Sequence, residues 1–291
     1  MRKIFILIVI IIIFILVNIL FNNKNTYHEK STQPLAELLN LKIQDITSFI
    51  ISNNDKIVLS RPSGEACVRI ESINYCSDST KISILKKFLN NNIKDTYDKT
   101  DENLQRLGFK KEIIPSIIIN NEKTLFFGNL NKYNEIYVLQ GNKIYKTLFY
   151  EGILETTTRS WLDKSTPLIP LTDTDEFDIK IIKYIYTNSK LIDERTCASM
   201  KHKELVLTTK HSALRNSFID LYPSDATRGG YPYSKDDESY MILLTSSNRD
   251  NSSTISIYQE EHLTYGIIDQ SDLRFVIPNS VYNNVKSYCK K

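Results

Sequence analysis

The common catalytic and nucleotide-binding motifs are missing from this 291-residue sequence. It contains no G-x-S-x-G elbow, no H-E-x-x-H metal pair, no Walker loop and no G-x-G-x-x-G turn. The four histidines, His28, His202, His211 and His262, form no recognisable ligand pair. The sequence therefore predicts no catalytic residue and no cofactor, and it argues against the common nucleotide-binding functions.

Cysteine spacing typical of metal sites is also missing, because no two cysteines are arranged as C-x-x-C. The even count of four cysteines suits disulfides in an oxidising compartment. Cys67 and Cys76 flank a short segment, which favours a local disulfide across a turn, and Cys197 and Cys289 would then pair by elimination. The alternative is four free buried thiols in a reducing compartment.

Charge of one sign does not dominate the chain, whose formal net charge is +3 and whose charged fraction is 24%. No dense basic stripe occurs, so the sequence does not indicate a nucleic-acid partner. The acidic run at 172–178 lacks the glycine turn and the final glutamate of a calcium-binding EF-hand. We therefore interpret it as a solvated linker, and we predict no metal site.

One long apolar run is present at residues 4–21. At about 1.5 Å per helical residue, it would span roughly 27 Å, close to the hydrocarbon core of a bilayer. Arg2 and Lys3 precede it, which predicts a cytoplasmic tip at residues 1–3 and an exported remainder. A cleaved leader is the alternative, although the run is long and no small-residue cleavage site follows. Asn18 is a candidate for contact with a partner helix; alternatively, its side chain is hydrated at the outer membrane–water interface.

The remaining chain has the pattern of an α+β protein with two repeated units, each a mainly antiparallel sheet with one or two packed helices. A juxtamembrane tether at 22–42 includes a short helix around Leu35–Leu39. The first repeat is predicted at 43–171 and the second at 172–291.

Within the first repeat, β-rich runs and helical spacings alternate. Lys81–Asp98 has apolar residues at helical spacing, with Asp78 or Ser79 as its N-cap. The other expected elements are a hairpin in Asp45–Arg61, a short strand at Cys67–Ile70, a helix at Asp101–Gly108, strand pairs turning at 120–122 and 141–142, and a helix at Glu155–Leu162.

The second repeat follows the same order. Asp178–Arg195 aligns with the first hairpin, His211–Tyr222 takes the place of the amphipathic helix, and four β-rich runs and a closing helix follow. Coincidence among β-rich segments of biased composition is the alternative. Pro223–Ser239 is predicted to be a loop, and Tyr231, Pro232 and Tyr233 are its candidate partner-contact residues.

A set of turn motifs resembles a known family. The motifs are Leu107-Gly108-Phe109, Pro115, Phe127-Gly128, Tyr137-Val138, Ile144-Tyr145 and Trp161-Leu162-Asp163-Lys164. In these residues the chain resembles the bacterial domain of unknown function numbered four-three-four-zero. The resemblance implies one N-terminal helix in the bacterial inner membrane, a periplasmic bulk and no known activity. It also implies a place beside auxiliary ABC transporters of the gliding-motility type.

These observations lead to one functional hypothesis: a single-pass membrane protein whose periplasmic repeats form a non-catalytic interaction module. Its expected partner is a protein of a membrane transport or envelope complex, met at exposed strand edges or at the joint between the repeats. Two alternatives are an envelope hydrolase that uses scattered carboxylates and a module that binds a small ligand or a lipid.

Overall fold

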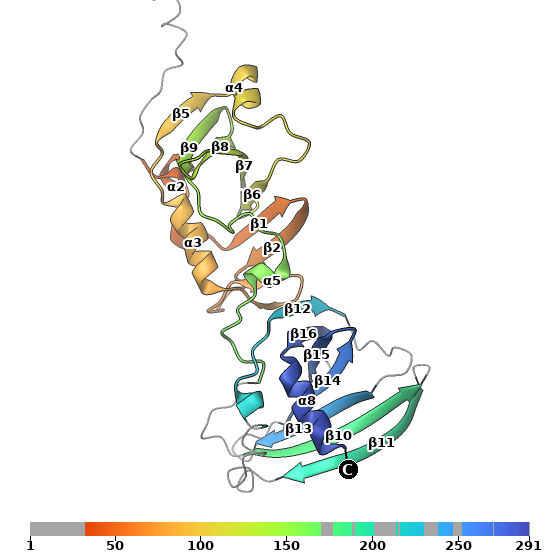
Figure 1. Cartoon of the computed structure of the whole chain (residues 1–291). Coiled ribbons are helices and arrows are strands. Elements are labelled where there is room, and N and C mark those ends of the chain that lie inside the picture. Colours follow the sequence, from red (N-terminus) through yellow and green to blue (C-terminus); the bar gives the residue numbers. More distant parts are fainter. Residues whose placement is uncertain are drawn as a thin grey trace, which may run out of the picture. The chain divides into compact units, whose positions relative to one another are not determined.

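The computed structural model of the chain describes residues 33–169, 177–187, 190–200, 214, 216–229, 238–246, 252–269 and 271–290. They form an α+β fold with two antiparallel sheets (Figure 1). One compact unit contains the described residues up to 56 together with 83–155, and the other contains 57–82 and the described residues from 156 onward. The predicted α+β class with antiparallel sheets is confirmed.

The first sheet has nine strands in the order β4-β3-β2-β1-β6-β7-β8-β9-β5. Their bounds are β1 Ser48–Asn53, β2 Asp55–Ser60, β3 Arg69–Ile70, β4 Tyr75–Cys76, β5 Asp95–Asp98, β6 Ser116–Ile119, β7 Lys123–Leu130, β8 Glu135–Gln140 and β9 Lys143–Leu148. The helices of this part of the chain are α2 Leu35–Leu38, η1 Ile43–Asp45, α3 Ser79–Leu89, α4 Asp101–Arg106 and α5 Thr158–Trp161.

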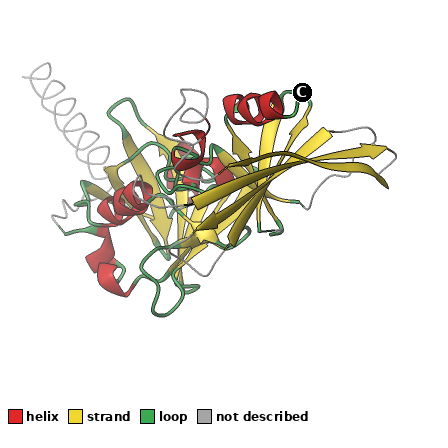
Figure 2. Cartoon of the chain, turned by 90° about the horizontal axis from the view of Figure 1, so that it is seen from below, coloured by secondary structure: helices red, strands yellow, loops and turns green. Residues whose placement is uncertain are grey.

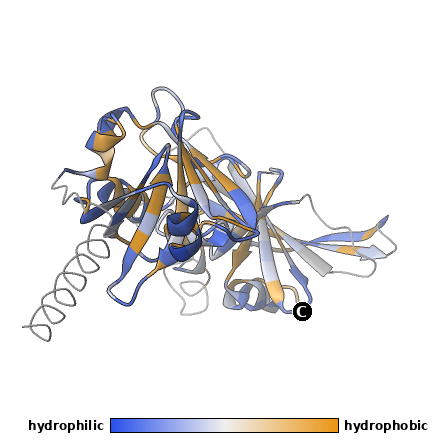
Figure 3. Ribbon diagram, turned by 90° about the horizontal axis from the view of Figure 1, so that it is seen from above, coloured by the Kyte–Doolittle hydropathy of each residue, from blue (hydrophilic) through white to orange (hydrophobic). Residues whose placement is uncertain are grey.

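One face of the first sheet forms a core with α3. Successive strand residues point to opposite faces, so the paired residues Ile51, Ile117 and Leu125 share one face, and each is at most 1% exposed. Phe127, two residues further along β7, lies on that face too, and its ring is 5.7 Å from that of Phe88 on α3. Hydrophobic and hydrophilic residues accordingly alternate along the strands (Figure 3).

The second sheet has seven strands in the order β11-β10-β13-β14-β15-β16-β12. Their bounds are β10 Phe177–Thr187, β11 Lys190–Met200, β12 Asp225–Arg228, β13 Glu238–Ser246, β14 Ser252–Glu260, β15 Leu263–Ile268 and β16 Leu273–Ile277. The closing helix α8, Asn279–Tyr288, lies alongside these strands (Figure 2). Tyr282 of α8 meets Tyr240 of β13 edge to face, with ring centroids 5.3 Å apart.

The two sheets repeat one topology. Without the short strands β3 and β4, the first sheet has the order β2-β1-β6-β7-β8-β9-β5, and numbering those seven strands along the chain gives 2-1-4-5-6-7-3. The second sheet, numbered in the same way, also gives 2-1-4-5-6-7-3. In both copies helical residues lie between the second and third strands, at α3 and at 216–219. The repeat predicted from the sequence is therefore present at the level of strand order.

The predicted helix at Lys81–Asp98 is too long. Asp78 does cap α3, since its Oδ1 accepts from the backbone N–H of Thr80 at 2.8 Å, but the helix ends at Leu89. Three asparagines at 90–92 follow, and asparagine is a weak helix former. Residues 95–98 are instead β5, which pairs with the distant strand β9.

The predicted loop at Pro223–Ser239 and the predicted helix at Glu155–Leu162 were wrong in part. Asp225–Arg228 is the edge strand β12, paired with β16. The helix is shorter than expected, because only Thr158–Trp161 is helical. The pairing of β12 depends on residues nearly fifty positions away, which a local pattern cannot reveal.

Two of the motifs that carry the family resemblance contact each other. A Cβ built on Gly128 would lie 2.3 Å from the carbonyl oxygen of Leu107, and Gly108 has a left-handed φ of +89°. The Leu107 carbonyl also accepts from the backbone N–H of Asn129 at 2.8 Å. Glycine is therefore required at both positions for a steric reason.

Candidate functional site

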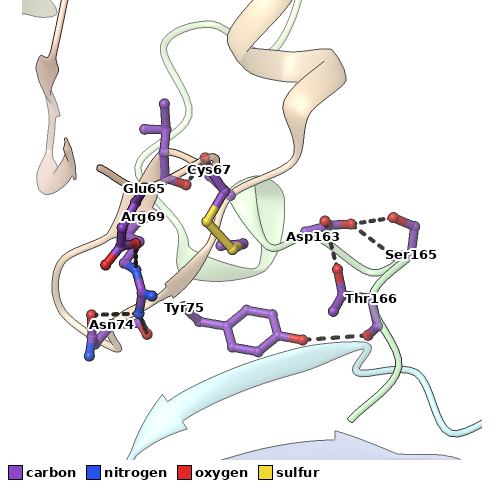
Figure 4. Close-up of a disulfide and its surroundings, with 11 residues drawn as sticks. Glu65, Cys67, Arg69, Asn74, Tyr75, Asp163, Ser165 and Thr166 are labelled. Atoms are coloured by element: carbon purple, nitrogen blue, oxygen red, sulfur yellow. Dashed lines mark hydrogen bonds and ion pairs between the residues drawn. A yellow bond between two sulfur atoms is a disulfide. The ribbon is translucent and has the colours of Figure 1, made fainter. Parts of the chain in front are cut away.

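The first disulfide joins Cys67 to Cys76 around the short strands β3 and β4 (Figure 4). The hydroxyl of Ser77 donates to the carbonyl of Val68 at 2.7 Å and adds a second link across the same turn. Arg69 forms an ion pair with Glu65. The disulfide and these polar contacts together restrict the segment between Cys67 and Cys76, which are nine residues apart, to one conformation.

Tyr75 connects this turn to the second sheet within the same compact unit. Its hydroxyl donates to the carbonyl of Thr166 at 3.4 Å (Figure 4). Its ring meets that of Phe275 on β16 edge to face, with ring centroids 5.4 Å apart. Burial, with a smaller contribution from the nearby Asp163 carboxylate, raises the pKa of Tyr75 to about 12. Tyr75 therefore stays a neutral hydrogen-bond donor, and it links this turn to the residues after α5 and to β16.

Asp163 and its neighbours complete the contact with β4. Burial alone would raise the pKa of Asp163, but hydrogen bonds from Ser165 and Thr166 outweigh it and hold that pKa below its ordinary value. The backbone N–H of Asp163 donates to the carbonyl of Cys76 at 3.1 Å. The carboxylate therefore fixes the turn that follows α5.

The second disulfide joins Cys197 on β11 to Cys289 at the end of α8. Ile181 pairs with Ala198 and Ile182 with Thr196, so Cys197 is the extra residue of a β-bulge. A bulge re-aims a side chain, and this one serves a cysteine that bonds the closing helix. Arg195 strengthens the same junction by donating from Nη2 to the carbonyl of Cys289 at 2.7 Å.

Both predicted cysteine pairs are confirmed, and free thiols are ruled out for all four cysteines. Two disulfides indicate an oxidising, extracytoplasmic compartment. The remaining predicted site residues, Asn18, Tyr231, Pro232 and Tyr233, lie outside the described residues, as does the apolar run at 4–21. In the part of the chain that the structure describes, no helix is both apolar and long enough to cross a bilayer.

A buried carboxylate organises an ion-pair network on the first sheet. Glu135 accepts from Lys94 at 2.6 Å and from the amide of Asn131 at 2.8 Å, and Lys146 lies 3.7 Å away. Lys146 also pairs with Asp95. The Lys94 hydrogen bond is the main cause of a lowered pKa at Glu135, and the Asp95 hydrogen bond is the main cause of a raised pKa at Lys146.

The lowered pKa of Glu135 makes stability depend on pH. Glu135 contributes to the free energy of unfolding at pH values above 4.5, which is the ordinary pKa of a glutamate. This contribution is lost as the pH falls through the lower pKa of Glu135 in the folded state, because the unfolded chain binds the proton more readily. In denaturant titrations at several acidic pH values, Glu135→Gln should flatten this loss and lower stability near neutral pH.

An exposed ion pair provides the control for Glu135. Asp98 lies 2.8 Å from Lys143, with 72% and 51% of the two side chains exposed. Solvent screens such pairs, so Asp98→Asn should change stability by at most about 0.5 kcal/mol. Equal losses in Glu135→Gln and Asp98→Asn would contradict a role for the buried network.

A second polar cluster surrounds Arg274, on the face of the second sheet opposite to its neighbour Phe275. Its guanidinium lies 2.8 Å from Glu260 and donates to the Thr227 hydroxyl at 3.0 Å. The same cation lies 4.7 Å from the ring centre of Tyr265. Neighbouring charges therefore balance in both polar clusters.

In the described ranges, no three His, Cys, Asp or Glu side chains are grouped so that they could hold a metal ion.

The outer strand β11 exposes apolar side chains whose exposure the sequence pattern does not indicate. Leu191 is 49% exposed and Ile192 is 64% exposed, and residues 190–196 are exposed throughout. The pairing of Ile185 with Asp193 and of Tyr186 with Leu191 leaves Ile192 as the extra residue of a second bulge. An apolar pair in a β-rich run resembles a core pair in the sequence, so no local signal distinguishes the two.

Comparison with known protein families, curated proteins and solved structures finds no match to this chain. The family resemblance of the turn motifs therefore stays a prediction.

Proposed function

We propose that the chain is a non-catalytic interaction module of the bacterial periplasm, anchored to the inner membrane through residues 4–21. Its partner would be a protein of a membrane transport or envelope complex. The two disulfides suit that compartment, because bonds of this kind persist where thiols are not kept reduced.

The observation that carries the proposal is a difference between the two copies. In the first copy the strands of the first hairpin, β1 and β2, have six residues each, whereas the equivalent β10 and β11 have eleven each. The longer hairpin exposes Leu191 and Ile192, and these two side chains are not part of the buried core. Two adjacent exposed aliphatic residues on an outer strand form an apolar patch, and this patch supports a contact surface.

Purification at native expression in a mild detergent tests this function. The double variant Leu191→Ser, Ile192→Ser should recover at least about tenfold less of the partner, since interface anchors each contribute on the order of 1–2 kcal/mol. Its free energy of unfolding should change by no more than about 0.5 kcal/mol, because both side chains are exposed.

Leu263 provides the matched control, because it is 47% exposed and lies on a different hairpin of the same sheet. Leu263→Ser should leave partner recovery unchanged. Recovery of the native chain alone, with no associated protein, would refute the proposed function.

A further inference from the structure

The repeated topology allows each strand of one copy to be compared with its equivalent in the other. In the first copy, the outer edge of β2 is covered by β3, with Leu59 paired to Ile70 and Ser60 paired to Arg69. The equivalent strand of the second copy is β11. Among the described residues, β10 is the only strand that pairs with β11.

On this basis we propose that β11 receives a short extended segment of a protein partner, which pairs antiparallel with it as β3 pairs with β2. The proposal rests on the proposed function and adds to it a location and a mode of binding. Strand addition supplies main-chain hydrogen bonds to an edge whose outer N–H and C=O groups have no strand partner among the described residues.

The position of the docked segment follows from the comparison. β3 pairs with the fifth and sixth residues of β2, Leu59 and Ser60. The fifth and sixth residues of β11 are Glu194 and Arg195. They lie inside the exposed part of the strand, shortly after the exposed apolar residues Leu191 and Ile192.

The two bulges of β11 define how much strand can be added. Ile192 and Cys197 are the extra residues, and the four residues between them, 193–196, form a regular run. Bulges discourage indiscriminate pairing along a strand edge. The two bulges of β11 therefore disfavour the addition of a long strand. A segment paired along these four residues would make more residue pairs than β3 makes with β2, which are two.

Charge indicates the composition of the partner segment. Asp193 and Glu194 are adjacent acids in the regular run, whereas the side chain of Arg195 already donates to the Cys289 carbonyl. Oppositely charged residues facing each other across strands are favourable. The segment should therefore carry basic residues opposite the acids and an aliphatic residue near Leu191, which is the combination that β3 has in Arg69 and Ile70.

The test places a photoreactive phenylalanine analogue at Leu191 or Thr196 of the full chain in its native cells, with Leu263 as the control position. Mass spectrometry of the adduct identifies the attached segment of the partner. A synthetic peptide of that segment is then added to the purified full chain, and amide hydrogen exchange is measured along β11. We expect adducts from both β11 positions, and exchange at 193–196 should slow by at least tenfold.

A charge variant provides an independent readout. Asp193→Lys combined with Glu194→Lys should weaken peptide binding at least tenfold. The control, Glu102→Lys with Glu112→Lys, changes two exposed acids outside the second sheet and should leave binding within twofold of the native value.

The possible outcomes separate this inference from the proposed function. A partner captured only from Leu263, or a peptide that binds without slowing exchange at 193–196, would overturn strand docking and leave the interaction role in place. An adduct to a second copy of this chain would replace the partner segment with self-assembly and would also overturn the inference. No adduct at any position, with no partner in the detergent purification, would overturn both.

Discussion

Removing the Cys197–Cys289 disulfide is expected to cost about 4–5 kcal/mol of stability, the largest effect of any change considered for this chain. The two cysteines are 92 residues apart, and a cross-link that closes a long loop restricts the unfolded chain most. A loss of this size approaches the total stability of many domains. The double variant Cys197→Ala, Cys289→Ala avoids leaving a free thiol, and its unfolding can be measured in denaturant.

The other disulfide is the natural comparison. Cys67 and Cys76 are only nine residues apart, so their removal as a pair should cost about 2–3 kcal/mol. Both disulfides belong to the same compact unit, which also contains the single tryptophan, Trp161, buried at 0% exposure. Its fluorescence reports unfolding of that unit in both variants. The opposite ranking of the two losses would show that loop length does not govern the contribution of these bonds.

Phe127→Ala is expected to destabilise the first sheet by about 3–5 kcal/mol, because it removes a large buried ring and leaves a cavity. Phe127 is 1% exposed and packs against Phe88 of α3. The neighbouring Phe126 makes a matched control on the same strand, since it points to the other face and is 39% exposed. Phe126→Ala should cost less than about 1.5 kcal/mol.

Hydrogen exchange of β6 to β8 together with denaturant unfolding would measure this pair of variants. If Phe127→Ala and Phe126→Ala lowered the free energy of unfolding by the same amount, the assignment of the two faces of β7 would be wrong. The register that pairs Phe127 with Val138 would then be wrong as well, because a slip of one residue exchanges the two faces.

Much of the first sheet could be predicted from local patterns. The turn at 120–122 contains Asn120 and Asn121 with positive φ, and Gly141 has a φ of +59° at the second turn. Asparagine and glycine tolerate that conformation, so their positions between β-rich runs were reliable signals. The disulfide pairs could also be predicted from spacing along the chain. The short separation between Cys67 and Cys76 favoured their pairing, which left Cys289 as the partner of Cys197.

The edge strands β5 and β12 were among the elements that local patterns missed. Each has four residues, and among the described residues each pairs only with the last strand of its own sheet, β9 or β16. Ile93 continued the helical spacing of α3 beyond its end at Leu89, and Asp225–Arg228 lay in a polar stretch. Pairing across many residues decided both strands, and it outweighed the local preference.

The sequence by itself determined the class of fold, the repeat, the main turns and the cysteine pairs, because each of these depends on spacing along the chain. Tertiary structure decided which residues remain exposed: Leu191 and Ile192 look like core residues until β11 is placed at an edge. It also decided that Glu135 is buried among cations. Exposure and charge balance arise from segments that meet only after folding, so no local pattern contains them.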